Sequence, residues 1–275
     1  MQLLEIDELF KSSWLVYKPR AIRLALITFL ASAVAAIVTG FLIGLTVFIG
    51  RTPIIHVGGW ILQFFKLTLV SIPTRPSMHD FILCGIIALF CLIYLLIVGT
   101  WFSATLWHAV LQPTNIDIGD AFEEGFKSIP RLLGVTVLVN TMIAIGSLFL
   151  IVPGILLSGW FVFAPIAAIK GNPIIKSIKY SRALVLGRWW AIVGRLILAG
   201  IIAVVLPRMI AQAPQSISSH PNATLVLLLA GIIPFLQALF LSPWYMIFKR
   251  MLYENAEQNM LTNFSTPVAP TLTLE

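Results

Sequence analysis

Long stretches without charge alternate along this chain with short segments that carry most of its charged residues. A helix of about 20 apolar residues crosses a hydrocarbon core about 30 Å thick. Because lipid offers the backbone no hydrogen bonds, apolar blocks of that length favour membrane-spanning helices. The pattern therefore predicts a multispan membrane protein. The stretches without Asp, Glu, Lys or Arg are 24–50, 81–116, 132–169 and 209–248, and a fifth, with Arg195 alone, is 189–206.

The stretch 132–169 is predicted to supply two spans. Its 38 residues would extend about 57 Å as one helix, nearly twice the thickness of the core. Pro153 removes a backbone donor and Gly154 permits a sharp reversal, so we expect a tight helical hairpin that turns at these two residues. The six spans are then placed at about 24–49, 81–108, 132–151, 154–169, 189–206 and 223–248.

Apolar side chains recur at helical spacing in three shorter segments, each placed before a pair of spans. These segments begin at Leu3, Asp117 and Pro173 and end at basic or aromatic borders. Amphipathic helices of this kind lie in the membrane interface with the apolar face toward the acyl chains. The expected fold is an all-α membrane protein with six transmembrane helices in three hairpins, each preceded by an interfacial amphipathic helix.

The remaining segments do not add a second domain. Residues 53–76 carry one polar stripe, which predicts a helix that either lies on the outer surface or re-enters the membrane. The composition is 59% hydrophobic and 11% charged, against about 25% charged in soluble domains. We expect a single polytopic domain over 1–262 and an irregular tail over 263–275, where Thr and Pro are frequent.

The basic residues are divided unequally between the two predicted sides. The side that holds both termini carries 14 of the 18 Lys and Arg residues, and the other side carries 4. Cytoplasmic loops keep the Lys and Arg excess, so both termini are expected in the cytoplasm. The basic residues follow the membrane borders and form no separate domain. The net charge of +7 therefore indicates contact with anionic lipid and not with nucleic acid.

The sequence offers little for catalysis or for a cofactor. Its four histidines are scattered singly, and none has metal-ligand spacing with a carboxylate or a cysteine. Phosphate-binding loops, nucleophile elbows and zinc-protease motifs are all absent from the sequence. We expect no metal, no cofactor and no catalytic residue. The one alternative is His108 with the acidic residues that follow Asp117, as part of a membrane enzyme acting on lipid.

Small side chains form a ridge on one face of the first predicted span. They recur every four residues and end in a G-x-x-x-G step, which permits close backbone approach between helices. Packing within the bundle is the simplest interpretation. Self-association into a homo-oligomer and a groove for a lipid chain are the alternatives. The ridge begins at Thr28 and continues with Ser32, Ala36, Gly40 and Gly44.

Three polar residues fall inside predicted spans. Asn140 and Gln237 are costly in lipid, so we expect them to face inward, as a structural pair or along a polar substrate path. Arg195 lies about a turn and a half inside the fifth span. It either extends its guanidinium to the interface or faces the interior of the bundle.

Four basic residues follow Pro173 in the third amphipathic segment. They are candidates for contact with anionic lipid headgroups, and simple retention of positive charge on the cytoplasmic side is the competing interpretation. These residues are Lys176, Lys179, Arg182 and Arg188.

The run that ends at Trp190 resembles a known family. Its Pro-Gly-Ile turn, Ala-Pro span and basic helix are similar to those of the YciC-like family of bacterial inner-membrane proteins and of the membrane domain attached to some glycerophosphoryl diester phosphodiesterases. The resemblance covers about 40 residues and departs from the family at Lys170, where an acidic residue is frequent. The residues that carry it are Pro153, Gly154, Ile155, Trp160, Ala164, Pro165, Ser181, Leu184, Gly187 and Trp189 or Trp190.

The resemblance implies a bacterial inner-membrane location and no enzymatic domain. The leading hypothesis is a non-catalytic multi-pass protein in envelope or lipid homeostasis, with membrane lipids and a possible protein partner. The alternative is a transporter or permease subunit with its path near Asn140, Gln237 and the break at Pro153. Absence of acidic residues from the predicted spans argues against an ion-driven pump.

Overall fold

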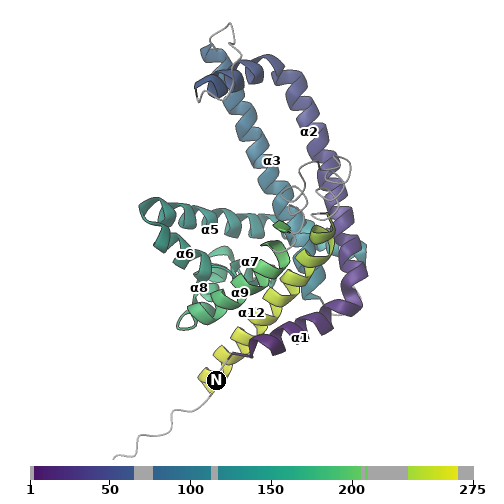
Figure 1. Ribbon diagram of the computed structural model, residues 1–275, viewed down its shortest axis with the longest axis vertical. Coiled ribbons are helices and arrows are strands. Elements are labelled where there is room, and N and C mark those ends of the chain that lie inside the picture. The colour runs from purple at the N-terminus through teal and green to yellow at the C-terminus, as the bar shows by residue number, and fades with distance from the viewer. Residues whose placement is uncertain (1–2, 65–76, 113–116, 206–207, 210–234, 266–275) are drawn as a thin grey trace, which may run out of the picture. The chain divides into compact units, whose positions relative to one another are not determined.

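The computed structural model describes residues 3–64, 77–112, 117–205, 208–209 and 235–265 (Figure 1). The molecule is about 91% helical and contains no strand in these ranges. It divides into two compact units, one formed by residues 1–29 with 103–275 and the other by residues 30–102.

The described residues form thirteen helical segments. Most are regular α-helices, one short segment is a 3-10 helix, and two are π-helical. In chain order they are α1 (Ile6–Tyr17), the 3-10 helix η1 (Lys18–Arg20), α2 (Ala21–Phe64), α3 (Met78–Leu111), α4 (Ile118–Lys127), α5 (Ile129–Phe149), α6 (Ile151–Trp160), α7 (Ala164–Ile169), α8 (Ile174–Val185), α9 (Trp189–Gly200), the π-helical η2 (Ile201–Val205) and η3 (Gln237–Leu241), and α12 (Ser242–Ser265).

Several of these helices are long and apolar enough to cross a membrane. Among the described residues there are four, and a fifth if α8 and α9 count as one span bent by 98°. The four candidates are Ile6–Leu42, Met78–Leu111, Ile129–Phe149 and Ile151–Ile169. A membrane-embedded helical protein is therefore supported, and helices occupy all three segments predicted to be amphipathic, as α1, α4 and α8.

The helix that contains the first predicted span extends beyond that span. The sequence predicts an end near residue 49, but α2 continues through Pro53 to Phe64. The expected outer segment over 53–76 thus begins as part of α2, and its second half lies outside the described residues. Of the sixth predicted span, 223–234 also lies outside them. α12 remains helical to Ser265, so the tail predicted from 263 begins as helix.

The reversal between α5 and α6 lies three residues before the predicted position. Leu150 is the extended residue, with φ −162° and ψ 144°, and its N–H donates to Gly146 O. Pro153 sits in the first turn of α6, where a proline costs no helical hydrogen bond. A Cβ on Gly154 would collide with the Ser147 side chain. Gly154 therefore permits close packing of α6 on α5 and does not form the turn.

The fourth predicted span is broken in its middle. α6 ends at Trp160 and α7 begins at Ala164, because Pro165 cannot supply the N–H that would continue one helix. The fully buried Ser181 of α8 bridges the break: its hydroxyl donates to Trp160 O at 2.8 Å and accepts from Phe163 N–H at 3.1 Å. One side chain thus satisfies both polar groups that the break exposes.

The unit formed by residues 30–102 contains α2 from Leu30 onward and α3 up to Phe102. Thr39 Oγ1 lies 3.4 Å from the Tyr94 hydroxyl. Most large apolar side chains described here are exposed, including Phe90 and Leu95 of α3. This pattern is the reverse of a soluble core.

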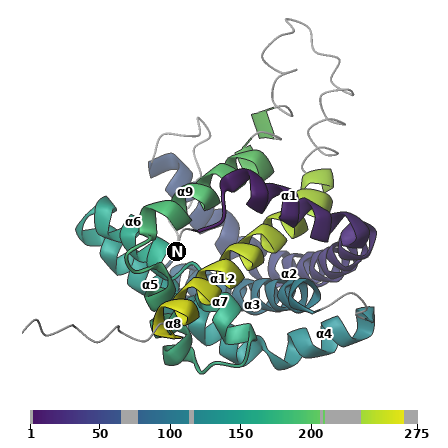
Figure 2. The same ribbon diagram turned by 90° about the horizontal axis from the view of Figure 1, so that it is seen from below.

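The other unit has a packed interior. α12 lies beside α1, as Figures 1 and 2 both show, with the Phe10 ring 5.0 Å from Phe248 and 5.6 Å from Trp244. The end of α3 is held by two arginines from other helices. Arg20 donates to Gln112 O at 3.1 Å and Arg250 to Val110 O at 2.6 Å. Cations at a helix C-terminus also complement its partial negative charge.

Candidate functional site

α8 has one buried apolar face and one exposed basic face. Pro173 is its extended N-cap residue, and Gly187, with φ +80°, lies just beyond its end, so proline and glycine delimit the helix. Ile178, Leu184 and Val185 are buried, together with Ser177 and Ser181. On the opposite face Lys176, Lys179 and Arg182 are exposed.

Apolar and aromatic groups border this basic face. Ile175 and Leu186, at the two ends of the helix, are 63% and 62% exposed. The Arg182 guanidinium lies 5.0 Å from the centre of the Trp160 ring on α6. Cation–π contact with a tryptophan is typical of a cation held at an apolar boundary. Arg188, by contrast, is half-buried beyond the end of α8, with its N–H donated to Val185 O.

The position of α8 is fixed by a polar cluster on α12. Glu257 accepts hydrogen bonds from the Tyr180 and Tyr253 hydroxyls, at 2.5 Å and 3.1 Å, and forms an ion pair with Lys170 at 2.8 Å. The Lys170 ammonium also lies 4.2 Å from the centre of the Tyr253 ring. This cluster joins three parts of the chain, namely the end of α7, the middle of α8 and α12.

The cluster keeps Glu257 ionised. Burial alone would raise the pKa of its carboxyl, but hydrogen bonds from Lys170 and Tyr180 outweigh burial and hold the pKa below its usual value. Burial and the Glu257 charge both raise the pKa of the Tyr253 hydroxyl, so this group stays protonated and remains a donor. Lys170 is thus paired with Glu257, whereas Lys176, Lys179 and Arg182 of α8 are exposed.

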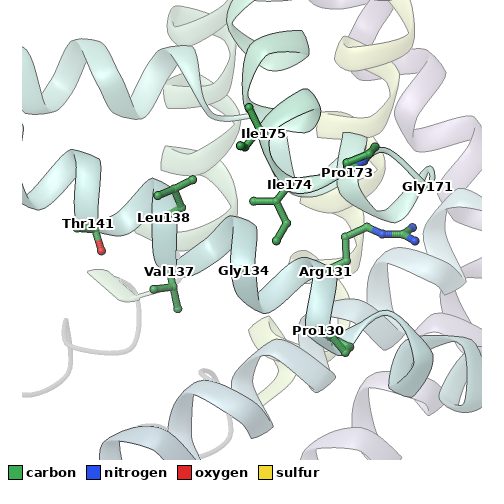
Figure 3. A pocket seen from close by; sticks show the side chains of 10 residues that line it. All are labelled: Pro130, Arg131, Gly134, Val137, Leu138, Thr141, Gly171, Pro173, Ile174 and Ile175. Atoms are coloured by element: carbon green, nitrogen blue, oxygen red, sulfur yellow. The ribbon is translucent and has the colours of Figure 1, made fainter.

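A groove of about 920 Å³ runs between α5 and the start of α8. Figure 3 shows α5 following it from Thr141 at the left to Arg131 at the right. Its wall is apolar, formed by Leu138 and Ile174 among others. Gly134 lets the start of α8 pack closely on α5, because a Cβ there would collide with the Ile174 side chain. Small and branched residues thus shape a hollow at the point where α8 meets α5.

One end of the groove is polar and positively charged. Arg131 is exposed there and donates to Ala168 O at 3.4 Å, the end of the range for a hydrogen bond. Gly171, with φ +99°, and Pro173 form the adjacent rim, which leads directly into the first turn of α8. That turn contains no acidic residue.

The ridge of small residues predicted on α2 is packed where it begins, at Thr28, which is 1% exposed, and is largely exposed beyond it. Ala36, Gly40 and Gly44 are exposed, Ser32 is half-buried, and a Cβ on either glycine would meet nothing within 4 Å. Packing of the rest of this ridge stays a prediction, as do its use in self-association and its use as a lipid groove.

The two polar residues expected inside spans differ in exposure. Asn140 is exposed on α5, because the buried face of this helix is formed by Leu132, Val135 and Val139. Gln237 is half-buried at the first position of η3. Their predicted pairing stays a prediction.

Arg195 has a role that the sequence did not indicate. Its guanidinium donates to Ala191 O and to Leu4 O, both at 2.9 Å, while its buried Nε has no partner in the described structure. Leu4 N–H in turn donates to Asn255 Oδ1 at 3.3 Å. Arg195 therefore holds the chain segment that precedes α1. This contact differs from the two expected roles, which were contact with the interface and a place in the bundle interior.

The residues proposed for an enzyme form a structural contact. His108 Nε2 lies 2.7 Å from Ser128 Oγ, and Ser128 donates its proton to Glu124 O at 2.9 Å. The Glu124 carbonyl oxygen can only accept, so the Ser128 hydroxyl proton is used there and the imidazole N–H of His108 donates to Ser128 Oγ. His108 therefore does not act as a base toward this serine. The acidic side chains Glu123 and Glu124 pair with Lys127. No metal-binding cluster occurs among the described residues.

No protein-family model, no curated protein and no solved structure matches this chain. The residues that carry the resemblance to the YciC-like family have architectural roles in the structure. Gly154 packs on Ser147, Pro165 begins α7, Ser181 bridges the break, and Trp189 Nε1 donates to Leu156 O at 3.2 Å.

Proposed function

We propose that this protein is a non-catalytic, multi-pass membrane protein that binds anionic lipid headgroups through the exposed basic face of α8. The observation that carries the proposal is the arrangement of Lys176, Lys179 and Arg182 on the face opposite the buried side of the helix. We propose lipid or envelope homeostasis as the process that this binding serves. Arg188, the fourth residue predicted from the sequence, is half-buried and contributes less.

Two physical arguments support headgroup contact over simple anchoring by positive charge. The exposed apolar residues Ile175 and Leu186 at the ends of α8, and Trp160 beneath Arg182, belong at the boundary between acyl chains and headgroups. A basic residue near an anionic leaflet contributes on the order of 1 kcal/mol to attraction. Three such residues on one face form a local binding site, whereas basic residues dispersed along the membrane borders do not.

The proposal includes an orientation and a family. Both termini and α8 lie on the cytoplasmic side of a bacterial inner membrane, and the chain is a relative of the YciC-like family. The unequal division of basic residues supports the orientation. The sequence run that ends at Trp190 supports the family.

The test measures anionic lipid that stays bound to the full-length protein. A variant with Lys176→Gln, Lys179→Gln and Arg182→Gln is purified in mild detergent from mixed vesicles of phosphatidylglycerol and phosphatidylcholine, and the retained lipid is quantified. We expect the preference for phosphatidylglycerol to fall about a hundredfold, since three contributions of order 1 kcal/mol are removed.

A control variant separates local from total charge. It carries the same loss of three charges at Lys11, Lys18 and Lys127, which are also exposed but lie outside α8. The proposal requires this control to keep the wild-type preference. Equal preference in all three proteins would refute headgroup binding by α8.

A permease subunit is the second candidate, and one observation favours it. The π-helical segments η2 and η3 contact each other, and η3 begins with Gln237. π-helical segments are rare and occur frequently at functional sites. Uptake of small solutes by proteoliposomes, compared between wild type and Gln237→Leu, tests this candidate. Uptake no faster than in protein-free vesicles would exclude it for the solutes used.

A further inference from the structure

The groove between α5 and α8 has the dimensions of one lipid chain. From Arg131 to Thr141 it follows ten residues of α5, about 15 Å at 1.5 Å per residue. Half of a hydrocarbon core about 30 Å thick is also about 15 Å. The groove therefore has the depth of one leaflet, which is the length that one acyl chain occupies.

The polarity of the groove changes along its length as it does along a lipid. Leu138, Val137 and Ile174 line its long part, whereas Arg131 lies at one end. Arg131 is the one charged side chain among the described residues that line the groove. An anionic group at that end meets a cation, and an acyl chain beyond it meets apolar side chains.

A second feature favours an anion at the same end. The first turn of α8 begins at Ile174, directly after the rim residues Gly171 and Pro173. Backbone N–H groups at a helix N-terminus carry partial positive charge and bind phosphate oxygens. The Arg131 guanidinium has five N–H donors, and its described hydrogen bond to Ala168 O uses one of them. The groove end thus offers both a guanidinium and a helix N-terminus.

We propose that this groove is a specific site for one anionic phospholipid, with an acyl chain along α5 and the phosphate at Arg131 and the first turn of α8. This inference rests on the proposed function and deepens it, because it distinguishes one tightly held lipid from the headgroups attracted by the exposed face of α8. Gly134 is then a positioning residue, since its missing side chain lets Ile174 pack directly on α5 and form the wall that the acyl chain meets.

The experiment counts tightly bound lipid by native mass spectrometry of the full-length protein in mild detergent. The probes are phosphatidylglycerol, phosphatidylcholine and glycerol 3-phosphate, which shares the phosphate but has no acyl chain. We expect one phosphatidylglycerol per chain, at least about tenfold preference over phosphatidylcholine, and no competition from glycerol 3-phosphate at equal concentration. Equal binding of the two lipids, or full competition by glycerol 3-phosphate, would overturn the proposal.

Two variants address the two ends of the site. Arg131→Gln removes the cation and is expected to weaken binding about tenfold, as loss of a charge-assisted hydrogen bond does, while Arg131→Lys keeps most of the binding. Leu138→Trp places an indole in the groove from a wall position that is 40% exposed, and is expected to abolish the bound lipid. Ile145→Trp, seven residues further along α5 and outside the groove, is the matched control and keeps it.

The variants also separate this proposal from the proposed function. Replacement of Lys176, Lys179 and Arg182 by Gln is expected to leave the one tight lipid in place while the general preference for anionic lipid falls. One outcome would refute the groove site alone. In it, the α8 variant loses the general preference for anionic lipid, while Arg131→Gln and Leu138→Trp keep the tightly bound lipid. Unchanged lipid in every variant would refute both.

Discussion

The middle of α3 and the helix α8 expose opposite kinds of residues. Between Phe81 and Ile97, α3 exposes large apolar side chains in almost every turn, whereas α8 exposes its three cations and packs one buried face against α5 and α12. The exposed cations are Lys176, Lys179 and Arg182. A helix that is apolar all round requires a surrounding that is also apolar. A helix with one apolar face requires a packed core on one side and a polar or charged medium on the other.

The difference indicates two sources of stability in one chain. Around α8 the free energy of folding comes from protein contacts, such as the hydrogen bonds of Ser181 and the cluster at Glu257. In the middle of α3 it comes from transfer of apolar surface into lipid. Substitutions of the same size are therefore expected to have different effects in the two regions.

The largest effect is expected for a charge in the middle of α3. Leu95 is 56% exposed. A leucine at the centre of a span favours membrane insertion, whereas an aspartate there opposes it. Leu95→Asp is therefore expected to raise the apparent insertion free energy of the α3 segment by about 3 kcal/mol. An insertion assay with residues 78–111 in a host membrane protein measures it. Leu95→Ala, the control, inserts nearly as well as wild type. If Leu95→Asp did so too, α3 would not be lipid-facing at this position.

The next effect is expected at the break between α6 and α7. Ser181→Ala leaves Trp160 C=O and Phe163 N–H buried without their partner, so the free energy of unfolding is expected to fall by about 2 kcal/mol. Thermal unfolding in detergent, followed by circular dichroism, measures the change. Ser158→Ala on α6 is the matched control, since this exposed serine bonds only to Ile155 O within its own helix. Equal stability of the two variants would contradict the bridging role.

A smaller effect is expected at the cluster on α12. Glu257→Gln keeps an acceptor for the two tyrosines but removes the charge that pairs with Lys170. Because this pair is partly open to solvent, we expect a loss of about 1 kcal/mol in unfolding free energy. Glu123→Gln, which removes a pair between two well-exposed side chains, is expected to change stability too little to measure. A larger loss in Glu123→Gln than in Glu257→Gln would reverse this ranking.

The pH dependence of stability sharpens the same point. The pKa of Glu257 is lower in the folded chain than its usual value of 4.5. Its contribution to stability is therefore fully present above about pH 4.5 and is lost as the pH falls further through the folded pKa. The difference in unfolding free energy between wild type and Glu257→Gln should shrink below pH 4.5. A difference that stays constant from pH 7 to pH 3 would show that the charge of Glu257 is not involved.

Local chemistry allowed much of the helix pattern to be predicted. The third amphipathic helix begins directly after Pro173 as predicted, although α8 ends at Val185, before the predicted border at residues 188–190, and α3 fills the second predicted span. The reversal before α6 was misplaced because proline is compatible with two positions, the turn itself and the first turn of a helix. Pro165 also signals the break between α6 and α7, although one continuous span is predicted over 154–169.

The candidate site was predictable only in part. The basic face of α8 follows from helical spacing, so Lys176, Lys179 and Arg182 could be identified in advance. Contacts between distant parts of the chain could not, because no local pattern encodes them. Glu257 meets Tyr180 across 77 residues, and Arg195 meets Leu4 across 191. The groove at Arg131 and Gly134 likewise forms only when the start of α8 packs on α5.

The central claim is that lipid covers the middle of α3 while α8 lies at the membrane surface. Single nitroxide labels at positions 95 and 179, in a chain whose two cysteines are replaced by alanine, test it directly in reconstituted vesicles. We predict that label 95 collides mainly with oxygen, which concentrates in the bilayer, and that label 179 collides mainly with a water-soluble nickel complex. A label at position 95 that is more accessible to nickel than the label at position 179 would contradict the account.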